Sequence, residues 1–550
     1  MPENNTVEII IKYSGNIVQL REQLNSEPSV TAVEDLGQGF AVVTISAAAV
    51  DSLYELTAIE DIELPKELYI NNLNNMISTC VVTAQSENGY GLSGQGVIVG
   101  IIDTGIDYTH PDFRTPEGLT RILAFWDQSG GGKPPDGFTF GREFTSEELN
   151  AALSSPDPIA VTGQLDIKGH GTAVAGIAAG GGISDPFQIG VAPKADIIAV
   201  RVLPAGNDYS RSTELMRAIK YVIDKARFFA EPVAINISYG MNEGAHLGDS
   251  LFEEYITAMS NLWKTSIIIP TGNEGGSGHH YFGTISSGEI KNVEFFTASG
   301  LNRFYVSMWK NFTDNISVEL ILPDGATTGI VTQENRIRTL NTRELTVNVI
   351  YNQPTRYSVS QEIFFDIKAA EGNFIKAGVW LLRLRADSIV DGQFNIWLPT
   401  VEEVTTGTYF SAPDNFGTLT IPSTSAKVIS VAGYNDSLDS AAEFSGRGFE
   451  NLALPIPDIT APAVGISAPR IGGGYDSYTG TSFAAPFVTG TAALMMEIGI
   501  VKGNAPYMYG ERIKAYLRRG AIRSDGVKYP NPIFGYGRLC AAASIAEILK

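Results

Sequence analysis

The chain of 550 residues contains little cysteine and no long apolar run. Its two cysteines, Cys80 and Cys540, lie far apart in the sequence and form neither a CxxC pair nor a disulfide framework, which favours a reducing compartment such as the cytoplasm. No stretch reaches the roughly 18 consecutive apolar residues that span a membrane. The N-terminus also lacks the basic and apolar regions of a secretory signal. We therefore expect neither secretion nor a membrane span.

Positive charge is scarce as well, because 39 Lys and Arg oppose 60 Asp and Glu and give a formal net charge of -21. A chain this acidic repels phosphate backbones, so nucleic acid is not an expected partner. The remaining composition, 44% hydrophobic and 18% charged, is that of an ordinary globular protein. At about 150 residues per domain, the length predicts three or four domain-sized units, or one large domain with insertions.

Residues 1–75 have the pattern of a small α+β unit. The segments VEIIIKY and GFAVVTI alternate like strands, whereas NIVQLREQL and AAAVDSLYELTAI have helical spacing. The segment ELYINNLNNMISTC, residues 67–80, reads as a polar, extended linker that joins this unit to the next one.

Residues 76–280 and 405–550 indicate a parallel α/β sheet with helices on both faces. Continuous apolar runs such as GVIVGIID, ADIIAVRVL, PVAINISYG and KVISVAGY are typical of strands buried on both faces, and helical segments lie between several of them. Between them, residues 281–404 contain short alternating segments with turn signals and no convincing helix. This stretch predicts an inserted antiparallel β-sandwich, jelly-roll-like in character.

Histidine is the side chain best suited to acid and base chemistry near neutral pH, and only five are present. His170 lies in GHGTAVAG, where small residues open a predicted helix. The pair His279-His280 has no carboxylate or cysteine at ligand spacing, so we interpret it as a solvated loop pair and predict no metal site.

Three further residues stand where an open parallel sheet collects functional groups. Asp103 ends the apolar strand VIVGIID, at the edge where the loops form a crevice, and its carboxylate needs a partner such as a histidine. Ser482 in GTSFAAP opens an apolar helix, whose free N–H groups favour developing negative charge. Asn273, in PTGNEGG, carries an amide that can donate to an oxyanion. Alone, each has an ordinary structural interpretation as a cap or turn residue.

Together, IIDTGID, GHGTAVAG, TGNEG and GTSFAAP resemble the four signature blocks of the subtilisin-like serine proteases, in the order Asp, His, Ser. The resemblance implies a catalytic triad of Asp103, His170 and Ser482, an oxyanion hole containing Asn273, and a peptide substrate bound as an added strand. It implies no cofactor. Calcium often stabilises members of this family, but no calcium loop is identifiable here, so structural calcium stays open.

The resemblance also implies a set of substrate-binding residues. They are Arg201, Val202 and Leu203 on a strand edge, Ser238, Tyr239 and Gly240 on one wall of the first specificity pocket, and Thr271 and Gly272 on the other. Tyr239 stands where many members have a smaller aliphatic residue.

The N-terminal unit, the segment SGQGVIVGIIDTGIDYTHPDF and the inserted β-sandwich resemble the clostridial spore-germination proteases. This resemblance implies a prodomain that assists folding, inhibits the protease and is cut off by self-cleavage between Leu68 and Cys80. It also implies activation of a zymogen, a spore cortex-lytic enzyme, and a cytoplasmic or spore location. Two alternatives stay open: a general intracellular subtilisin, and a pseudoprotease acting as a sensor or scaffold. A dinucleotide-binding enzyme is disfavoured, because the GYGLSG match precedes its strand instead of following it.

Overall fold

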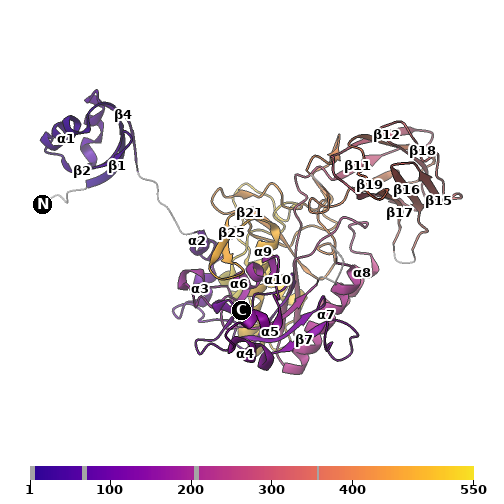
Figure 1. Ribbon diagram of the computed structural model, residues 1–550, viewed down its shortest axis with the longest axis horizontal. Coiled ribbons are helices and arrows are strands. Elements are labelled where there is room, and N and C mark those ends of the chain that lie inside the picture. The colour runs from indigo at the N-terminus through magenta and orange to yellow at the C-terminus, as the bar shows by residue number, and fades with distance from the viewer. Residues whose placement is uncertain (1–5, 65–70, 203–209, 356–357, 405) are drawn as a thin grey trace. The chain divides into compact units, whose positions relative to one another are not determined.

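The computed structural model describes residues 6–64, 71–202, 210–355, 358–404 and 406–550. The chain divides into two compact units, Met1–Ile70 and Asn71–Lys550 (Figure 1).

The N-terminal unit is a four-stranded antiparallel sheet carrying one α-helix. The strands β1 (Thr6–Tyr13), β2 (Val30–Gly37), β3 (Phe40–Ser46) and β4 (Ile59–Glu63) lie in the order β2-β3-β1-β4. Helix α1 (Ile17–Ser26) buries Leu20 and Leu24 in the core of this unit, and the 3-10 helix η1 (Ala47–Glu55) contributes Leu53. The α+β prediction is confirmed, although β2 was not anticipated, since its sequence VTAVEDLG is mostly exposed and has no clear alternation.

The large unit is built on a mixed sheet whose central strands are parallel. Its order is β22-β21-β10-β9-β5-β8-β6-β7, with β23 beside β21. The strands are β5 (Ile98–Asp103), β6 (Ile122–Asp127), β7 (Arg142–Thr145), β8 (Asp196–Arg201), β9 (Val233–Ile237), β10 (Thr265–Pro270), β21 (Ile429–Asn435), β22 (Ser440–Ala441) and β23 (Ile459–Pro462). Only β7 and β22, at the two ends, run antiparallel to their neighbours.

Helices cover both faces of this sheet, as the sequence predicts. Along β5, Val99 and Ile101 belong to the core with helices α6 (His170–Ala179) and α9 (Thr481–Met496). The alternate residues, Ile98 and Ile102, pack with α7 (Ser212–Phe229) and α8 (Leu251–Ser260). Among the described residues, Thr481–Val501 is long and apolar enough to cross a membrane, and 89% of its most apolar window is buried inside the protein, as expected of a core helix. The remaining α-helices described in this unit are α2 (Asn71–Ser78), α3 (Val81–Gln85), α4 (Ser146–Leu153), α5 (Pro158–Thr162), α10 (Gly510–Gly520) and α11 (Ala541–Ala546).

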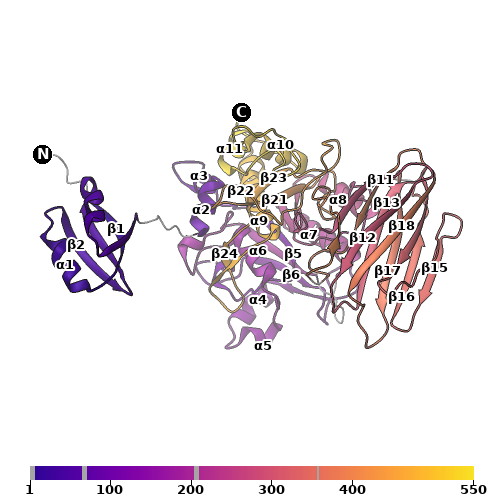
Figure 2. The same ribbon diagram turned by 90° about the horizontal axis from the view of Figure 1, so that it is seen from above.

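The insertion forms two antiparallel sheets that face each other (Figure 2). One sheet has the order β11-β19-β13-β17-β16-β15 and the other β14-β18-β12-β20. Their strands are β11 (His280–Thr284), β12 (Ile290–Thr297), β13 (Arg303–Asn311), β14 (Asn315–Ile321), β15 (Ile337–Asn341), β16 (Leu345–Tyr351), β17 (Ser360–Ala369), β18 (Gly378–Ser388), β19 (Gln393–Trp397) and β20 (Tyr409–Phe410). Phe295, Phe365 and Trp380 are fully buried between the sheets, which confirms the predicted β-sandwich.

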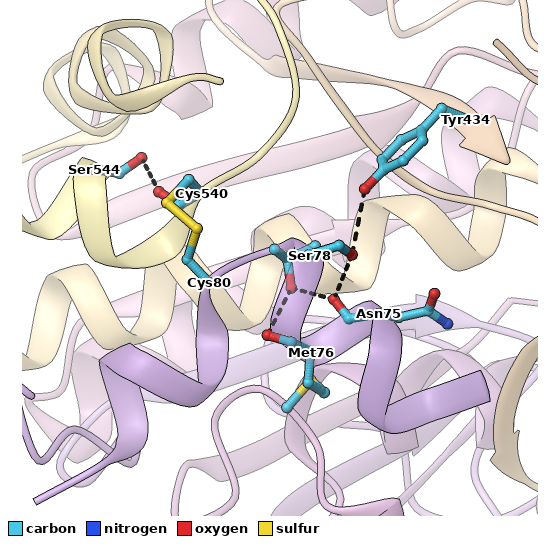
Figure 3. Close-up of a disulfide and its surroundings, with 8 residues drawn as sticks. Asn75, Met76, Ser78, Cys80, Tyr434, Cys540 and Ser544 are labelled. Carbon is cyan, nitrogen blue, oxygen red and sulfur yellow. Dashed lines mark hydrogen bonds between the residues drawn. A yellow bond between two sulfur atoms is a disulfide. The ribbon is translucent and has the colours of Figure 1, made fainter. Parts of the chain in front are cut away.

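The two cysteines are bonded to each other, contrary to the sequence-based expectation (Figure 3). Cys80 lies between α2 and α3, and Cys540 immediately precedes α11, with their Cα atoms 4.9 Å apart. This separation is within the range that a disulfide requires. The folding of the chain brings the two positions together, and their spacing in the sequence gave no sign of it. The two cysteines therefore no longer support the prediction of a reducing compartment.

The segment interpreted as an extended linker is also partly helical, because Asn71–Ser78 forms α2. The Tyr434 hydroxyl donates to Ser78 Oγ over 3.4 Å (Figure 3). The Thr79 hydroxyl donates to the Asn75 carbonyl over 2.6 Å. The expectation of an extended segment is wrong from Asn71 onward; residues 65–70 lie outside the described chain.

Candidate active site

Asp103 is the last residue of β5, and its side chain is almost completely buried. Its Oδ1 accepts hydrogen bonds from the Thr104 N–H and from Nδ1 of His170, both over 2.7 Å. The predicted partner of this carboxylate is therefore the histidine. A buried carboxylate in this place holds the imidazole in one tautomer and favours its protonated form.

His170 begins helix α6, and the turn before it is held by Asp166. One carboxylate oxygen of Asp166 accepts from the Gly169 N–H over 2.9 Å, and the other accepts from the Thr172 N–H over 3.0 Å. Gly169 has a positive φ of 79°, which favours glycine at this position. Burial lowers the pKa of His170, but the nearby carboxylates, Asp103 foremost, together outweigh burial, so the pKa is raised above its usual value.

Ser482 is the second residue of α9, as predicted, and faces the same cleft as His170. Among the described contacts, no hydrogen bond joins its hydroxyl to the His170 ring. The ring of the next residue, Phe483, lies 5.2 Å from the His170 ring, centroid to centroid. In enzymes without substrate such hydrogen bonds are often long, and they tighten when the substrate binds.

The Asn273 amide follows β10 and is oriented by Thr481. Its Oδ1 accepts from both the N–H and the hydroxyl of Thr481, each over 3.1 Å. The amide nitrogen therefore points the other way, where it donates to Oε1 of Glu402 over 3.1 Å. The structure thus fixes which end of the amide is available as a donor.

These four side chains line one cleft with a volume of about 1710 Å³. One side of the cleft belongs to the inserted β-sandwich, which contributes Phe304, Tyr305 and Phe374. The predicted pocket residues Ser238, Tyr239, Gly240 and Gly272 also line it. A Cβ atom at Gly240 or Gly272 would lie 2.6 or 2.5 Å from the Thr420 hydroxyl, so glycine is required where these walls meet.

Three of the predicted substrate-binding positions need correction. The backbone of Arg201 is paired on both sides, with β5 and β6, since β8 lies inside the sheet. The N–H of Val202 donates to the Asp103 carbonyl, and its carbonyl accepts from the Tyr239 hydroxyl over 2.8 Å. Neither residue offers a free strand edge, although the Arg201 side chain lines the cleft. Thr271 is fully buried, with its hydroxyl 3.4 Å from that of Ser445, and is not among the residues that line the cleft. Leu203 lies outside the described residues.

The histidine pair is buried, so its interpretation as a solvated loop pair is wrong. His279 Nδ1 lies 2.8 Å from a carboxylate oxygen of Glu274, and the His280 ring stacks on Trp397 with the centroids 4.8 Å apart. His280 begins β11, so the pair lies where the chain enters the insertion, and the structure there covers both rings. Burial lowers the pKa of His280.

The described residues contain no group of three or more His, Cys, Asp or Glu side chains arranged to hold a metal ion. Sequence reasoning missed Asp166, Thr481 and Glu402. An acidic residue four positions before His170 is a signal for Asp166, and adjacency to Ser482 is one for Thr481. Glu402 had no signal, because 129 positions separate it from Asn273.

Comparison with known proteins agrees with this geometry. Residues 94–343 and 406–537 match the subtilase family, peptidase S8, so the chain belongs to this family of serine proteases. Residues 1–66 match the Csp protease B prodomain. The fold is thus subtilisin-like, with a prodomain before the protease domain.

The chain is similar to the CspB protease of Clostridium perfringens, with 34% identity and a TM-score of 0.80 over 87% of this chain and 98% of that one. It is 25% identical over 95% of its length to the PIII-type proteinase of Lactococcus lactis subsp. cremoris. It is also 24% identical over 93% of its length to the minor extracellular protease Vpr of Bacillus subtilis. The chain spans only 28% of the first of these two relatives and 58% of the second.

Proposed function

We propose that this protein is an active serine endopeptidase that uses Asp103, His170 and Ser482. The observation that carries the proposal is the 2.7 Å hydrogen bond between Asp103 and His170 in the cleft that Ser482 and Asn273 also line. The buried Asp103 carboxylate binds Nδ1 of His170 and so holds the ring in the tautomer that a general base of this kind needs.

In the proposed mechanism, the Ser482 oxygen attacks the scissile carbonyl while Nε2 of His170 takes the hydroxyl proton. Asp103 stabilises the imidazolium that forms. The negative charge on the carbonyl oxygen is stabilised by the Asn273 amide and the Ser482 N–H. His170 then gives its proton to the leaving amine, and water hydrolyses the acyl-enzyme in the reverse sequence of proton transfers.

We further propose that the substrate is a protein zymogen, cut by limited proteolysis during spore germination, and that the protein works in the cytoplasm or a spore compartment. Similarity to the CspB protease supports this proposal. Of these two locations, the Cys80–Cys540 bond argues against the cytoplasm, because disulfides are rare where thiols are kept reduced. The N-terminal unit acts as an intramolecular inhibitor and folding aid, consistent with its match to a Csp protease B prodomain.

A serine-directed fluorophosphonate tests the activity. We expect the wild-type chain to be labelled at Ser482 and the Ser482→Ala variant to remain unlabelled. Absence of both labelling and self-processing in a folded wild-type protein would favour the sensor or scaffold interpretation. Mass spectrometry of both proteins tests self-processing, because only the wild type should lose its prodomain, by a cut between residues 68 and 80.

A further inference from the structure

A turn of the inserted β-sandwich brings a carboxylate to the oxyanion hole. Residues 398–404 lie between strands β19 and β20 of the insertion, and Glu402 within this turn accepts the hydrogen bond from the Asn273 amide nitrogen over 3.1 Å. Because Thr481 holds the other end of the amide, Asn273 cannot turn away from Glu402 without breaking two hydrogen bonds. The contact therefore joins a defined donor to an acidic acceptor.

The turn itself is anchored next to the same asparagine. The Val401 N–H donates to Oε1 of Glu274 over 2.9 Å, and Glu274 directly follows Asn273. Within the turn, the N–H and hydroxyl of Thr400 both donate to the Glu403 carboxylate over 3.1 Å. The backbone that carries Glu402 is thus fixed, whereas the Glu402 side chain is exposed and has room to rotate into solvent.

A carboxylate in this position opposes the chemistry of the cleft. Peptide hydrolysis creates a negative charge on the substrate oxygen beside the Asn273 amide. Although this amide has two N–H groups, an oxyanion bound to the second would lie only a few ångströms from a like charge. The Glu402 carboxylate also raises the pKa of His170, together with Asp103 and Asp166, and so favours the protonated ring that cannot act as a base.

We propose that Glu402 is a latch on the oxyanion hole: it occupies the Asn273 amide in the resting enzyme and must move away before a substrate can react. This inference rests on the proposed serine protease activity. It gives the inserted β-sandwich a specific role, since its turn between β19 and β20 sets the resting reactivity of the site.

The experiment compares the rate of fluorophosphonate labelling at Ser482 in wild-type and variant full-length proteins. The samples are matched for the fraction of chains that still carry the prodomain. We expect Glu402→Ala to be labelled about tenfold faster than wild type, which corresponds to about 1.4 kcal/mol. Glu371→Ala is the matched control, because Glu371 is an exposed carboxylate of the same cleft with no described bond to Asn273. Its rate should stay within about twofold of wild type. Equal thermal melting temperatures exclude altered folding as the cause.

Two further measurements separate the latch from a general loss of charge. On the alkaline plateau of the pH profile, where His170 is neutral in every variant, the gain from Glu402→Ala should disappear in an Asn273→Ala background, since no amide is left to release. In Glu402→Gln, the acid limb of the pH profile should move to lower pH, because the charge that raises the His170 pKa is gone.

An unchanged or lower labelling rate in Glu402→Ala overturns the latch while leaving the protease activity intact, and so does a gain that persists without Asn273. No labelling of Ser482 in either the wild type or Glu402→Ala overturns the proposed activity itself.

Discussion

Removal of the disulfide is expected to destabilise the large unit. The bond joins positions 460 residues apart, and it connects the segment around α2 and α3 to the C-terminal helix α11. In the chain-entropy description, a loop of this length restricts the unfolded chain by about 20 cal/mol/K, or about 6 kcal/mol at 25 °C, which is an upper value. The folded state keeps the packing of α11 against α3 and α10.

This free energy converts into a measurable melting shift. The unit Asn71–Lys550 has an unfolding entropy on the order of 1 kcal/mol/K, at about 2.1 cal/mol/K per residue. The variant with both Cys80→Ser and Cys540→Ser should therefore melt up to about 6 °C below wild type in differential scanning calorimetry at one scan rate.

Wild type treated with a reductant should melt at the temperature of the variant, and the variant should not respond to the reductant. Titration of the unreduced, unfolded wild-type chain should find no free thiol. Two free thiols, or a variant that melts within about 1 °C of wild type, would refute the reasoning.

Three other predictions concern the site and the core. Asn273→Ala should lower kcat for peptide hydrolysis by about 10²- to 10³-fold, the cost of losing one oxyanion-hole donor in subtilisin, and an unchanged kcat would remove Asn273 from the mechanism. Because His170 must be neutral to act as a base and its pKa is raised, kcat/KM should fall as the pH drops through that raised pKa. Asp103→Asn should shift this acid limb to lower pH and reduce the plateau by about 10⁴-fold, and a limb that does not move would contradict the assignment. Finally, Asp458→Asn should destabilise the fold by about 3 kcal/mol, because it removes the charged partner of Arg518 and of the Lys514 ammonium, which lies 2.9 Å from this buried carboxylate; urea unfolding that shows no change would count against this pairing.

Short sequence patterns predicted the strands and helices whose formation depends mainly on residues close together in the chain. Strand β5 is recognisable because a continuous apolar run must be buried on both faces. The position of Asp103 was predictable because functional groups in an open parallel sheet collect at the carboxyl ends of the strands. His170 and Ser482 each open a helix, and small residues on both helices reveal close packing. Alternation of apolar residues similarly identified the β-sandwich.

Predictions that depended on neighbours in space failed more often. A strand edge was expected at Arg201 because the segment resembles a substrate-pairing strand, but two neighbouring strands occupy its backbone. His279 and His280 were interpreted as solvated because no carboxylate or cysteine stood at ligand spacing, whereas Thr408 and Trp397, more than a hundred positions away, contact their rings in the fold.

The sequence by itself therefore determined the order of the domains and the identity of the candidate triad, because these are encoded in short segments whose burial and backbone requirements are local. Only the tertiary structure decided that Cys80 meets Cys540 and that Glu402 meets Asn273. Each of these contacts joins residues more than a hundred positions apart, and its geometry is set by how the intervening domains pack.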